Sequence, residues 1–219
     1  MATRQVLAEL GNAFEQRCGG EVAFESVGGV DAARRVQGGE PFDVVVLASS
    51  AIDALVATGR VIAGSKVDLV RCGVAIAVRA GAPRPDIGSE DALRRAVQSA
   101  RSVGYSTGPS GVQLARLFER WGLTAEIQDR IVQAPPGVPV GALVARGEVE
   151  LGFQQLSELI PLSGIDVIGP LPPAIQIVTT FSAGVCARST QAGAVHRMLD
   201  FMTSPLAADA IRRHAMEPA

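Results

Sequence analysis

Small and hydroxyl-bearing residues follow several apolar runs of this 219-residue chain. Four such turns lead from an expected strand into an expected helix, at 26–30 (Ser-Val-Gly-Gly-Val), 48–50 (Ala-Ser-Ser), 106–111 (Ser-Thr-Gly-Pro-Ser-Gly) and 136–138 (Pro-Gly-Val). In parallel sheets, such turns lie at the carboxyl ends of the strands, where ligands bind. Glycine lets backbone N–H groups approach a ligand, the helix start adds unpaired donors and partial positive charge, and hydroxyls add further donors. The pattern therefore predicts an anion site that needs no Lys or Arg.

The residues that we expect to bind this anion share small size or a neutral donor. Backbone N–H groups are expected from Gly28, Gly29 and Val30, and a second helix start from Ser49 and Ser50. A further set of donors comprises Ser106, Thr107, Ser110 and Gly111, and Gln155 offers an amide after an apolar strand. Taken alone, a loop of this kind is more often an ordinary helix cap.

Other catalytic chemistry has little support in the residues. The only histidines, His196 and His214, fall in the expected C-terminal helices, which disfavours a Ser-His-Asp triad. No HExxH motif occurs, no Lys follows Gly111 as a P-loop would require, and the stretch around Gly28 is not GxGxxG. The cysteines, Cys18, Cys72 and Cys186, form no CxxC pair, so neither a disulfide framework nor a zinc site is expected. We therefore expect no metal and no cofactor.

Composition narrows the possible partners. The net charge is −2, aromatic residues make up 4% of the chain, and no basic block is interleaved with aromatics, so nucleic-acid binding is not expected. No apolar run approaches the roughly 18 residues of a membrane helix, so membrane insertion is not expected either. The chain begins with an amphipathic helix instead of the apolar core of a secretory signal. This start predicts a cytoplasmic protein, or a mature or truncated form.

Strands and helices are expected to alternate, which predicts an α/β fold with mainly parallel sheets. Helical spacing predicts a first helix over 3–18, followed by a short strand over 22–26, and a short helix is expected near 125–132. Two long apolar strands, 67–78 and 175–186, bracket about a hundred residues that form an α/β set of their own. We expect them to be crossovers between lobe 1 (1–76 plus 179–219) and lobe 2 (77–178). One continuous sheet is the alternative.

Several short segments resemble the type 2 periplasmic solute-binding proteins, specifically their molybdate-binding branch, over nearly the whole chain. The segments are 24–34, Gly39-Glu40-Pro41-Phe42-Asp43-Val44-Val45, Ala48-Ser49-Ser50, Tyr105-Ser106-Thr107, 143–152 and 201–207. The resemblance implies two α/β lobes joined by two crossover strands, with a small anionic ligand in the cleft. It also implies a periplasmic protein that delivers its ligand to an ABC permease.

The ligand positions of that family are carried over residue by residue. Tetrahedral oxyanions are bound there by Ser hydroxyls, backbone N–H groups and a Tyr, and these positions fall near 28–30, near Ser110 and Gly111, near Gly137, and at Gln154 or Gln155. Gly28-Gly29 stands where the family has serines, and Gln154-Gln155 where molybdate binders have their Tyr. These departures leave room for a small organic acid instead of molybdate.

Two other functions stay open. One relative in this branch is an aconitate isomerase, so the chain could isomerise a small polycarboxylate, with a hidden carboxylate or Tyr105 as the base. An intracellular sensory domain is the other. The family also begins with a strand before its first helix, whereas this chain begins at that helix. We expect either that the start lies too far downstream or that another chain fills the gap, which would give a dimer.

Overall fold

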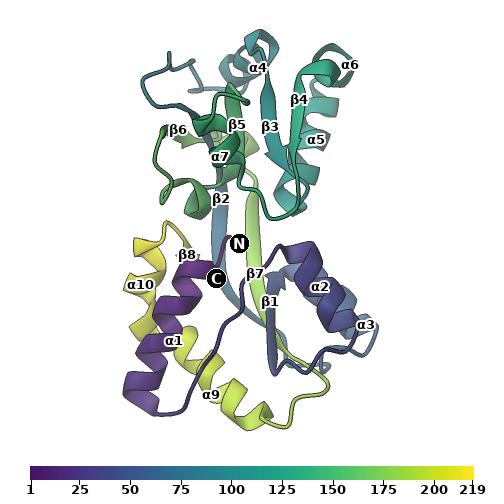
Figure 1. The fold of residues 1–219 in the computed structure, drawn as a ribbon, viewed down its shortest axis with the longest axis vertical. Helices are drawn as coiled ribbons and strands as arrows, with labels where there is room; N and C mark the ends of the chain where they lie inside the picture. Colours follow the sequence, from purple (N-terminus) through teal and green to yellow (C-terminus); the bar gives the residue numbers. More distant parts are fainter. The chain divides into compact units, whose positions relative to one another are not determined.

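The computed structural model describes residues 1–219, and these form two compact units. Unit 1 contains Met1–Cys72 and Thr179–Ala219, and unit 2 contains Gly73–Val178. The chain enters unit 2 within the long strand β2 (Val67–Arg79) and returns at β7 (Val178–Val185) (Figure 1). Helices and strands alternate along the chain, which confirms the predicted α/β class. None of the helices is both long and apolar enough to cross a membrane.

Unit 1 is built around the pair formed by β1 (Val44–Ala48) and β7. The two strands are antiparallel, in register from Val44 opposite Val185 to Ala48 opposite Phe181. Helices α2 (Gly29–Gln37) and α3 (Ser49–Ala57) contact β1, and their apolar side chains form one buried cluster with it. This cluster fixes where both helices begin relative to the end of β1.

A second layer of unit 1 consists of helices from the two ends of the chain. Helix α1 (Arg4–Cys18) lies against α9 (Ala192–Met202) and α10 (Ala208–Arg213), as Figure 1 shows. The rings of Phe14 and Phe201 lie 5.9 Å apart between α1 and α9. Nε2 of His214 and Oε2 of Glu9 lie 2.8 Å apart, and Arg213 pairs with the same carboxylate. A 3-10 turn (Pro205–Ala207) precedes α10, and the short strand β8 (Glu217–Pro218) pairs with β2.

The segment 22–26 is not a strand, so the prediction of a strand there was wrong. Strand β1 stands at the end of the sheet and pairs only with β7, and 22–26 does not pair with its free edge. The segment packs on α1 instead. The Val22 N–H donates to Oε1 of Glu15 at 2.6 Å, and the ring of Phe24 would lie 3.0 Å from a Cβ on Gly11. Alternating burial alone does not make a strand when no partner supplies hydrogen bonds.

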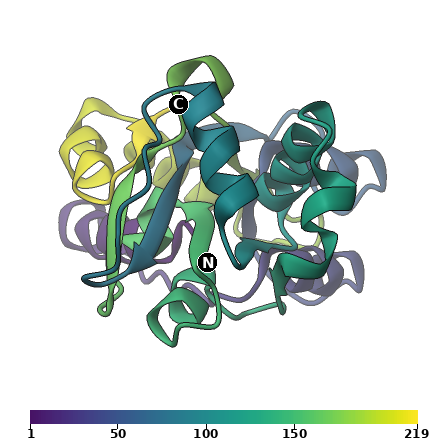
Figure 2. The ribbon, with the colours of Figure 1, turned by 90° about the horizontal axis from the view of Figure 1, so that it is seen from above.

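Unit 2 is a sheet with helices on both faces. Strand β3 (Val103–Ser106) pairs in parallel with β4 (Ile131–Ala134) on one side and with β5 (Leu151–Gln155) on the other. Helices α4 (Glu90–Ser99) and α5 (Pro109–Arg120) pack on one face of the sheet (Figure 2). Their side chains Leu93, Leu114 and Phe118 share a buried cluster with Phe153. Helix α7 (Val140–Ala145) packs on the other face, against Gly104 and Gly152. Strand β6 (Ile165–Pro170) pairs with β2.

Two further expectations are corrected here. The sheets are not mainly parallel, because parallel pairing is confined to β3, β4 and β5, whereas β1, β2, β6 and β7 have antiparallel partners. The helix expected near 125–132 is shorter. It comprises α6 (Thr124–Ile127) and a 3-10 turn (Gln128–Arg130), and residues 131–134 form β4. Pairing of Val103 with Ile131 through Ser106 with Ala134 overrides the local helical pattern.

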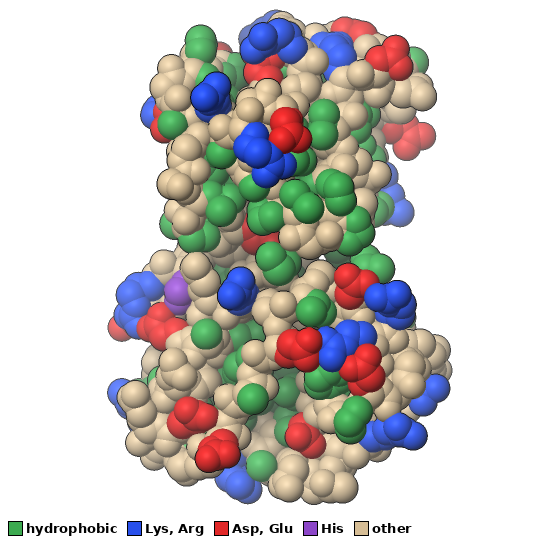
Figure 3. Space-filling view, viewed as in Figure 1, with side chains coloured by type: hydrophobic (Ala, Val, Ile, Leu, Met, Phe, Trp, Pro, Cys, Tyr) green, Lys and Arg blue, Asp and Glu red, His purple; other side chains and the backbone are tan.

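Charged side chains lie mostly on the surface in small mixed groups. On the face shown in Figure 3, Lys and Arg side chains stand close to Asp and Glu side chains on both units. Arg35, for example, pairs with both Glu25 and Glu40.

Replacement of Glu9 by Gln is expected to lower the melting temperature at pH 7. The hydrogen bond from Arg213 is the main cause that holds the pKa of Glu9 below its ordinary value. The carboxylate therefore stabilises the fold above its ordinary pKa, and this contribution is lost as the pH falls through the lowered value. We expect Glu9→Gln to lower the melting temperature by about 1–3 °C at pH 7, and by less toward pH 3. Melting scans across this range test this, with Glu21→Gln as a control, and a difference that does not shrink in acid would contradict it.

Candidate functional site

The candidate residues of unit 1 lie together at the carboxyl end of β1. Ser49 and Ser50 open α3, which follows β1 directly. Gly28 is the N-cap of α2, and a Cβ on Gly29 would lie 3.8 Å from the side chain of Leu47. The starts of α2 and α3 are therefore neighbours. Val30, in the first turn of α2, is 61% exposed.

The candidate residues of unit 2 lie at the carboxyl edge of its parallel strands. Ser106 ends β3 and Gln155 ends β5, and these strands are paired at Tyr105 and Phe153. The loop through Thr107 leads from β3 into α5, and the Gly108 N–H donates to Oγ of Ser106 at 3.3 Å. Gly137 lies in the turn before α7, with φ of +80°. This positive φ favours glycine and accounts for that residue in the turn.

Three helix starts in these regions are not capped by side chains. The N-caps are Gly28 for α2, Ala48 for α3 and Gly108 for α5, and none forms a side-chain cap hydrogen bond. Among the α-helices, α4 is the one with a side-chain cap, because Oγ of Ser89 accepts a hydrogen bond from the Ala92 N–H at 3.1 Å. The first-turn N–H groups of α2, α3 and α5 therefore remain as donors, and each helix adds partial positive charge there.

The hydroxyl groups at these starts are also available as donors. Ser49, Ser50, Thr107 and Ser110 form no hydrogen bond with the rest of the protein through their side chains. Other serines of the chain do form hydrogen bonds through their hydroxyls. Ser65 donates to the carbonyl of Ile62, Ser182 to Asp68 and Ser189 to Asp43. Ser110 is 6% exposed, so its hydroxyl stands in a sheltered position. Pro109 before it has no N–H, which makes Ser110 and Gly111 the first residues of α5 that can donate.

Helix α5 approaches β3 more closely than a side chain at Gly111 would allow. A Cβ on Gly111 would lie 1.7 Å from the carbonyl oxygen of Ser106 and 3.2 Å from the ring of Tyr105. Gly111 therefore keeps the first turn of α5 at the end of β3. Gly111 thus has a packing role in the structure, and its role as a donor to a ligand stays a prediction.

Gln154 is buried and its amide is bound inside unit 2. Its Oε1 accepts a hydrogen bond from the Gly141 N–H in the first turn of α7 at 3.1 Å. Its Nε2 donates to Oε2 of Glu158 at 2.9 Å. One amide hydrogen is left for any ligand, so binding by Gln154 stays a prediction. Gln155, the last residue of β5, is 4% exposed.

Glu158 is a site residue that the sequence reasoning missed. It lies on the short helix α8 (Leu156–Leu159) and is half-buried. Burial is the largest cause acting on the pKa of this carboxyl, and it raises that pKa above its ordinary value by more than the lowering causes, the hydrogen bond from Gln154 among them, offset. The Arg side chains of unit 2 that form ion pairs do so with other carboxylates, namely Glu90, Glu148, Glu150 and Asp166. The spacing of four residues from Gln154, across an expected helix start, is the signal that could have identified it.

Tyr105 belongs to the core of unit 2. It is 7% exposed, and its ring meets that of Phe118 edge to face with centroids 6.0 Å apart. Burial raises the pKa of its hydroxyl above the ordinary value of 10.0. The phenol therefore stays protonated at neutral pH, which makes Tyr105 a poor choice as the base.

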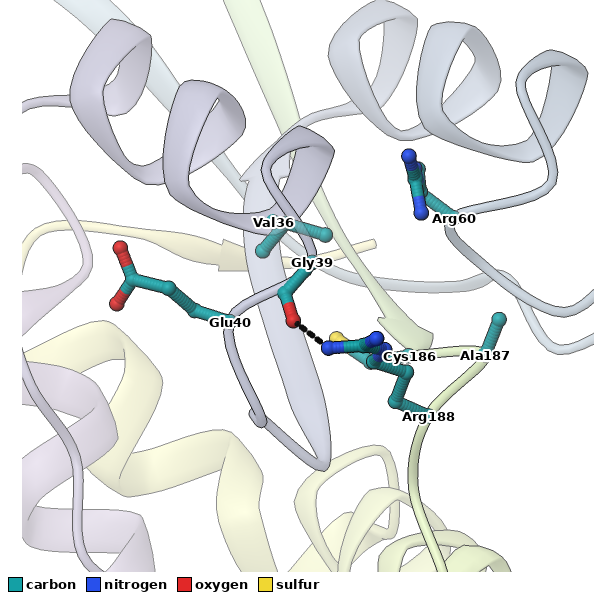
Figure 4. Close-up of a pocket in the computed structure, with 7 residues that line it drawn as sticks. All are labelled: Val36, Gly39, Glu40, Arg60, Cys186, Ala187 and Arg188. Atoms are coloured by element: carbon teal, nitrogen blue, oxygen red, sulfur yellow. Dashed lines mark hydrogen bonds between the residues drawn. The ribbon is translucent and has the colours of Figure 1, made fainter.

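A small cavity in unit 1 does not coincide with the candidate residues. It has a volume of about 20 Å³, room for one water molecule, and is lined by Val36, Gly39, Glu40, Arg60, Cys186, Ala187 and Arg188 (Figure 4). Nη1 of Arg188 donates to the carbonyl of Gly39 at 2.5 Å. The Cys186 N–H bonds the carbonyl of Asp43, so the cavity lies at the amino end of β1, opposite Ser49. Burial, with Asp43 acting in the same direction, raises the pKa of the Cys186 thiol to about 11, which leaves it unreactive.

Comparison with known proteins now decides the family. A model of the bacterial extracellular solute-binding proteins matches residues 1–217. The chain belongs to this family. The resemblance that the sequence segments carry is thereby confirmed, together with a binding-protein role.

Individual relatives add detail. An aconitate isomerase from a Pseudomonas species is 40% identical over 218 residues, which cover 97% of this chain and 83% of that protein. The periplasmic molybdate-binding protein of Azotobacter vinelandii has a TM-score of 0.79 at 20% identity, covering 98% of this chain and 95% of that one. A sulfate-binding protein of Mycobacterium tuberculosis has a TM-score of 0.77 at 20% identity, and the match covers 100% of this chain and 83% of that one. At this identity, the two solved structures show a shared fold.

Replacement of Gly111 by Ala is expected to destabilise the protein. The new Cβ would meet the backbone carbonyl of Ser106, which cannot move without shifting α5 or β3. We expect a loss of at least about 1–3 kcal/mol in the free energy of unfolding, measured by urea titration. Gly193→Ala in α9 is the control, because its nearest outside atom lies 4.0 Å away. The control is expected to gain up to about 1 kcal/mol, and an equal gain for Gly111→Ala would refute the close approach.

Proposed function

We propose that the protein binds a small di- or tricarboxylate through neutral donors at helix starts, with α2 and α3 as the candidates in unit 1 and α5 as the candidate in unit 2. The observation that carries the proposal is that these helices begin without side-chain caps, beside hydroxyls that have no partner in the protein. Such donors stabilise negative oxygen atoms without a basic side chain. The proposed ligand residues are those expected from the sequence.

A carboxylate with a carbon skeleton is favoured over an inorganic oxyanion. Two apolar side chains stand exposed in the first turns of the donor helices, Val30 in α2 at 61% and Val112 in α5 at 48%. A methylene group can pack against such side chains, whereas a tetrahedral oxyanion needs hydrogen-bond donors around it. The 40% identical relative is named for aconitate, a tricarboxylate, whereas the molybdate- and sulfate-binding structures are 20% identical.

Two physiological roles follow from such binding. Membership of the solute-binding family supports transport, in which the protein would work in the periplasm and deliver its ligand to an ABC permease. The aconitate isomerase, similar over 97% of this chain, supports a second role in which the bound tricarboxylate is isomerised. Both roles use the same donors.

Thermal shift with a ligand panel is expected to identify the ligand class. A ligand present at 100 times its dissociation constant adds about 2.7 kcal/mol, which corresponds to a rise of about 5–10 °C in melting temperature. We expect this rise with cis-aconitate, trans-aconitate or citrate. Molybdate, tungstate, sulfate and phosphate are expected to leave the melting temperature unchanged. A rise with molybdate and none with the carboxylates would contradict the proposed class.

Replacement of Ser110 by Ala is expected to weaken binding of the best carboxylate in that panel. The hydroxyl has no partner in the protein, so its loss removes a donor without breaking an internal contact. One lost hydrogen bond is worth about 0.5–1.5 kcal/mol, which is a rise of roughly 2–12-fold in the dissociation constant. Calorimetric titration measures this, with Ser163→Ala in an exposed loop of unit 2 as the control. Equal constants for Ser110→Ala and wild type would remove Ser110 from the site.

A further inference from the structure

The carboxylate of Glu158 accepts its side-chain hydrogen bond from a neutral group. Its hydrogen bond comes from the neutral amide of Gln154, whereas the ion-paired carboxylates of unit 2 bond Arg side chains. Gln154 in turn is fixed by the Gly141 N–H, so the amide cannot rotate without losing a buried hydrogen bond. One carboxylate oxygen is thereby held, and the other is left to act.

The position of Glu158 joins it to the proposed ligand donors of unit 2. Helix α8 follows β5 directly, and Glu158 lies within its single turn. The end of β5 is adjacent to the end of β3, because parallel neighbours in a sheet lie about 4.8 Å apart. Ser106 and the start of α5 follow at that edge. Glu158 and the start of α5 therefore follow neighbouring strands at the same edge of the sheet.

We propose that Glu158 is the group that moves a proton on the bound carboxylate, and that Gln154 is the residue that positions it. This inference rests on the proposed function, because it assigns a catalytic step to the same site. It names the residues that carry out the isomerisation proposed above as the second role.

The reaction is a 1,3-shift of one proton in an unsaturated tricarboxylate. The carboxylate of Glu158 takes a proton from the methylene carbon next to the double bond, and the electron pair of that C–H bond forms a new C=C bond. The π electrons of the old double bond move to its far carbon and into the carboxylate attached there. Glu158 then delivers a proton to that far carbon, either the one it took or one exchanged with solvent, so the carboxylate is regenerated and no oxidant or reductant is consumed.

The surroundings suit both halves of this transfer. A proton-transfer group works best when its pKa approaches the working pH, and burial raises the pKa of Glu158 in that direction. The negative charge that develops on the substrate's carboxylate is stabilised by the N–H groups of Ser110 and Gly111, which have no partner inside α5. Val112 offers an apolar contact to the methylene carbon.

The test compares Glu158→Gln with wild type in two measurements. Calorimetry gives the dissociation constant for trans-aconitate, and proton NMR in D₂O gives the rates of isomerisation and of deuterium incorporation at the methylene carbon. Gln can accept the same hydrogen bond from Gln154, so the fold is expected to persist. We expect the dissociation constant to change by less than about tenfold and both rates to fall by about 10²–10⁴-fold. Glu119→Gln, an exposed carboxylate of α5, is the matched control and is expected to match wild type.

The outcomes separate this inference from the proposed function. If wild type binds trans-aconitate but neither isomerises it nor incorporates deuterium, the inference is wrong and the binding function stands. Rates in Glu158→Gln equal to wild type would also overturn it. If wild type binds none of the carboxylates, the proposed function fails and the inference fails with it. Should Glu158→Gln not fold, Glu158→Asp keeps the charge, and its rates are expected to fall at least about tenfold because the carboxylate is displaced by one methylene.

Discussion

A backbone N–H at the start of a helix has no partner within that helix, and this constraint shapes the whole candidate site. In α4 the hydroxyl of Ser89 accepts a hydrogen bond from one such N–H, whereas α2, α3 and α5 have no side-chain cap hydrogen bond. A buried donor without a partner costs about 1–3 kcal/mol, so such starts are tolerated only where water or a ligand can reach them. The ends of β1, β3 and β5 provide such places, and small residues such as Gly111 bring the helices close to them.

The parts of the structure that were predictable from the sequence depend on local signals. Glycine, proline and serine stop strands and start helices through their own backbone and side-chain chemistry, so the starts of α2, α3 and α5 could be read directly. The long strand expected over 67–78 is observed as Val67–Arg79, because a run of β-branched and apolar residues admits little else. The placement of Ser49, Ser106 and Gln155 at strand ends followed from these two signals, whereas the strand expected before Gly28 is not formed.

The parts that were not predictable depend on neighbours distant in sequence. Residues 131–134 form a strand because β3 lies beside them, and 22–26 do not form one because nothing pairs with them there. The role of Glu158 depends on burial and on Gln154, whose amide is turned by the Gly141 N–H. Residue type and spacing place a carboxyl near the strand end, but they do not show whether a cation will neutralise it.

The neutral amide of Gln154 is what allows the Glu158 carboxyl to serve two purposes. An Arg in place of Gln154 would hold Glu158 ionised, lower its pKa and fix both of its oxygens. An amide satisfies one oxygen, leaves the pKa high and caps α7 with its other end. The absence of basic side chains, which suits ligand binding through helix starts, is thus the same condition that keeps Glu158 able to exchange a proton. One edge of the sheet can therefore provide both the neutral donors that bind the ligand and the half-buried carboxyl that transfers a proton.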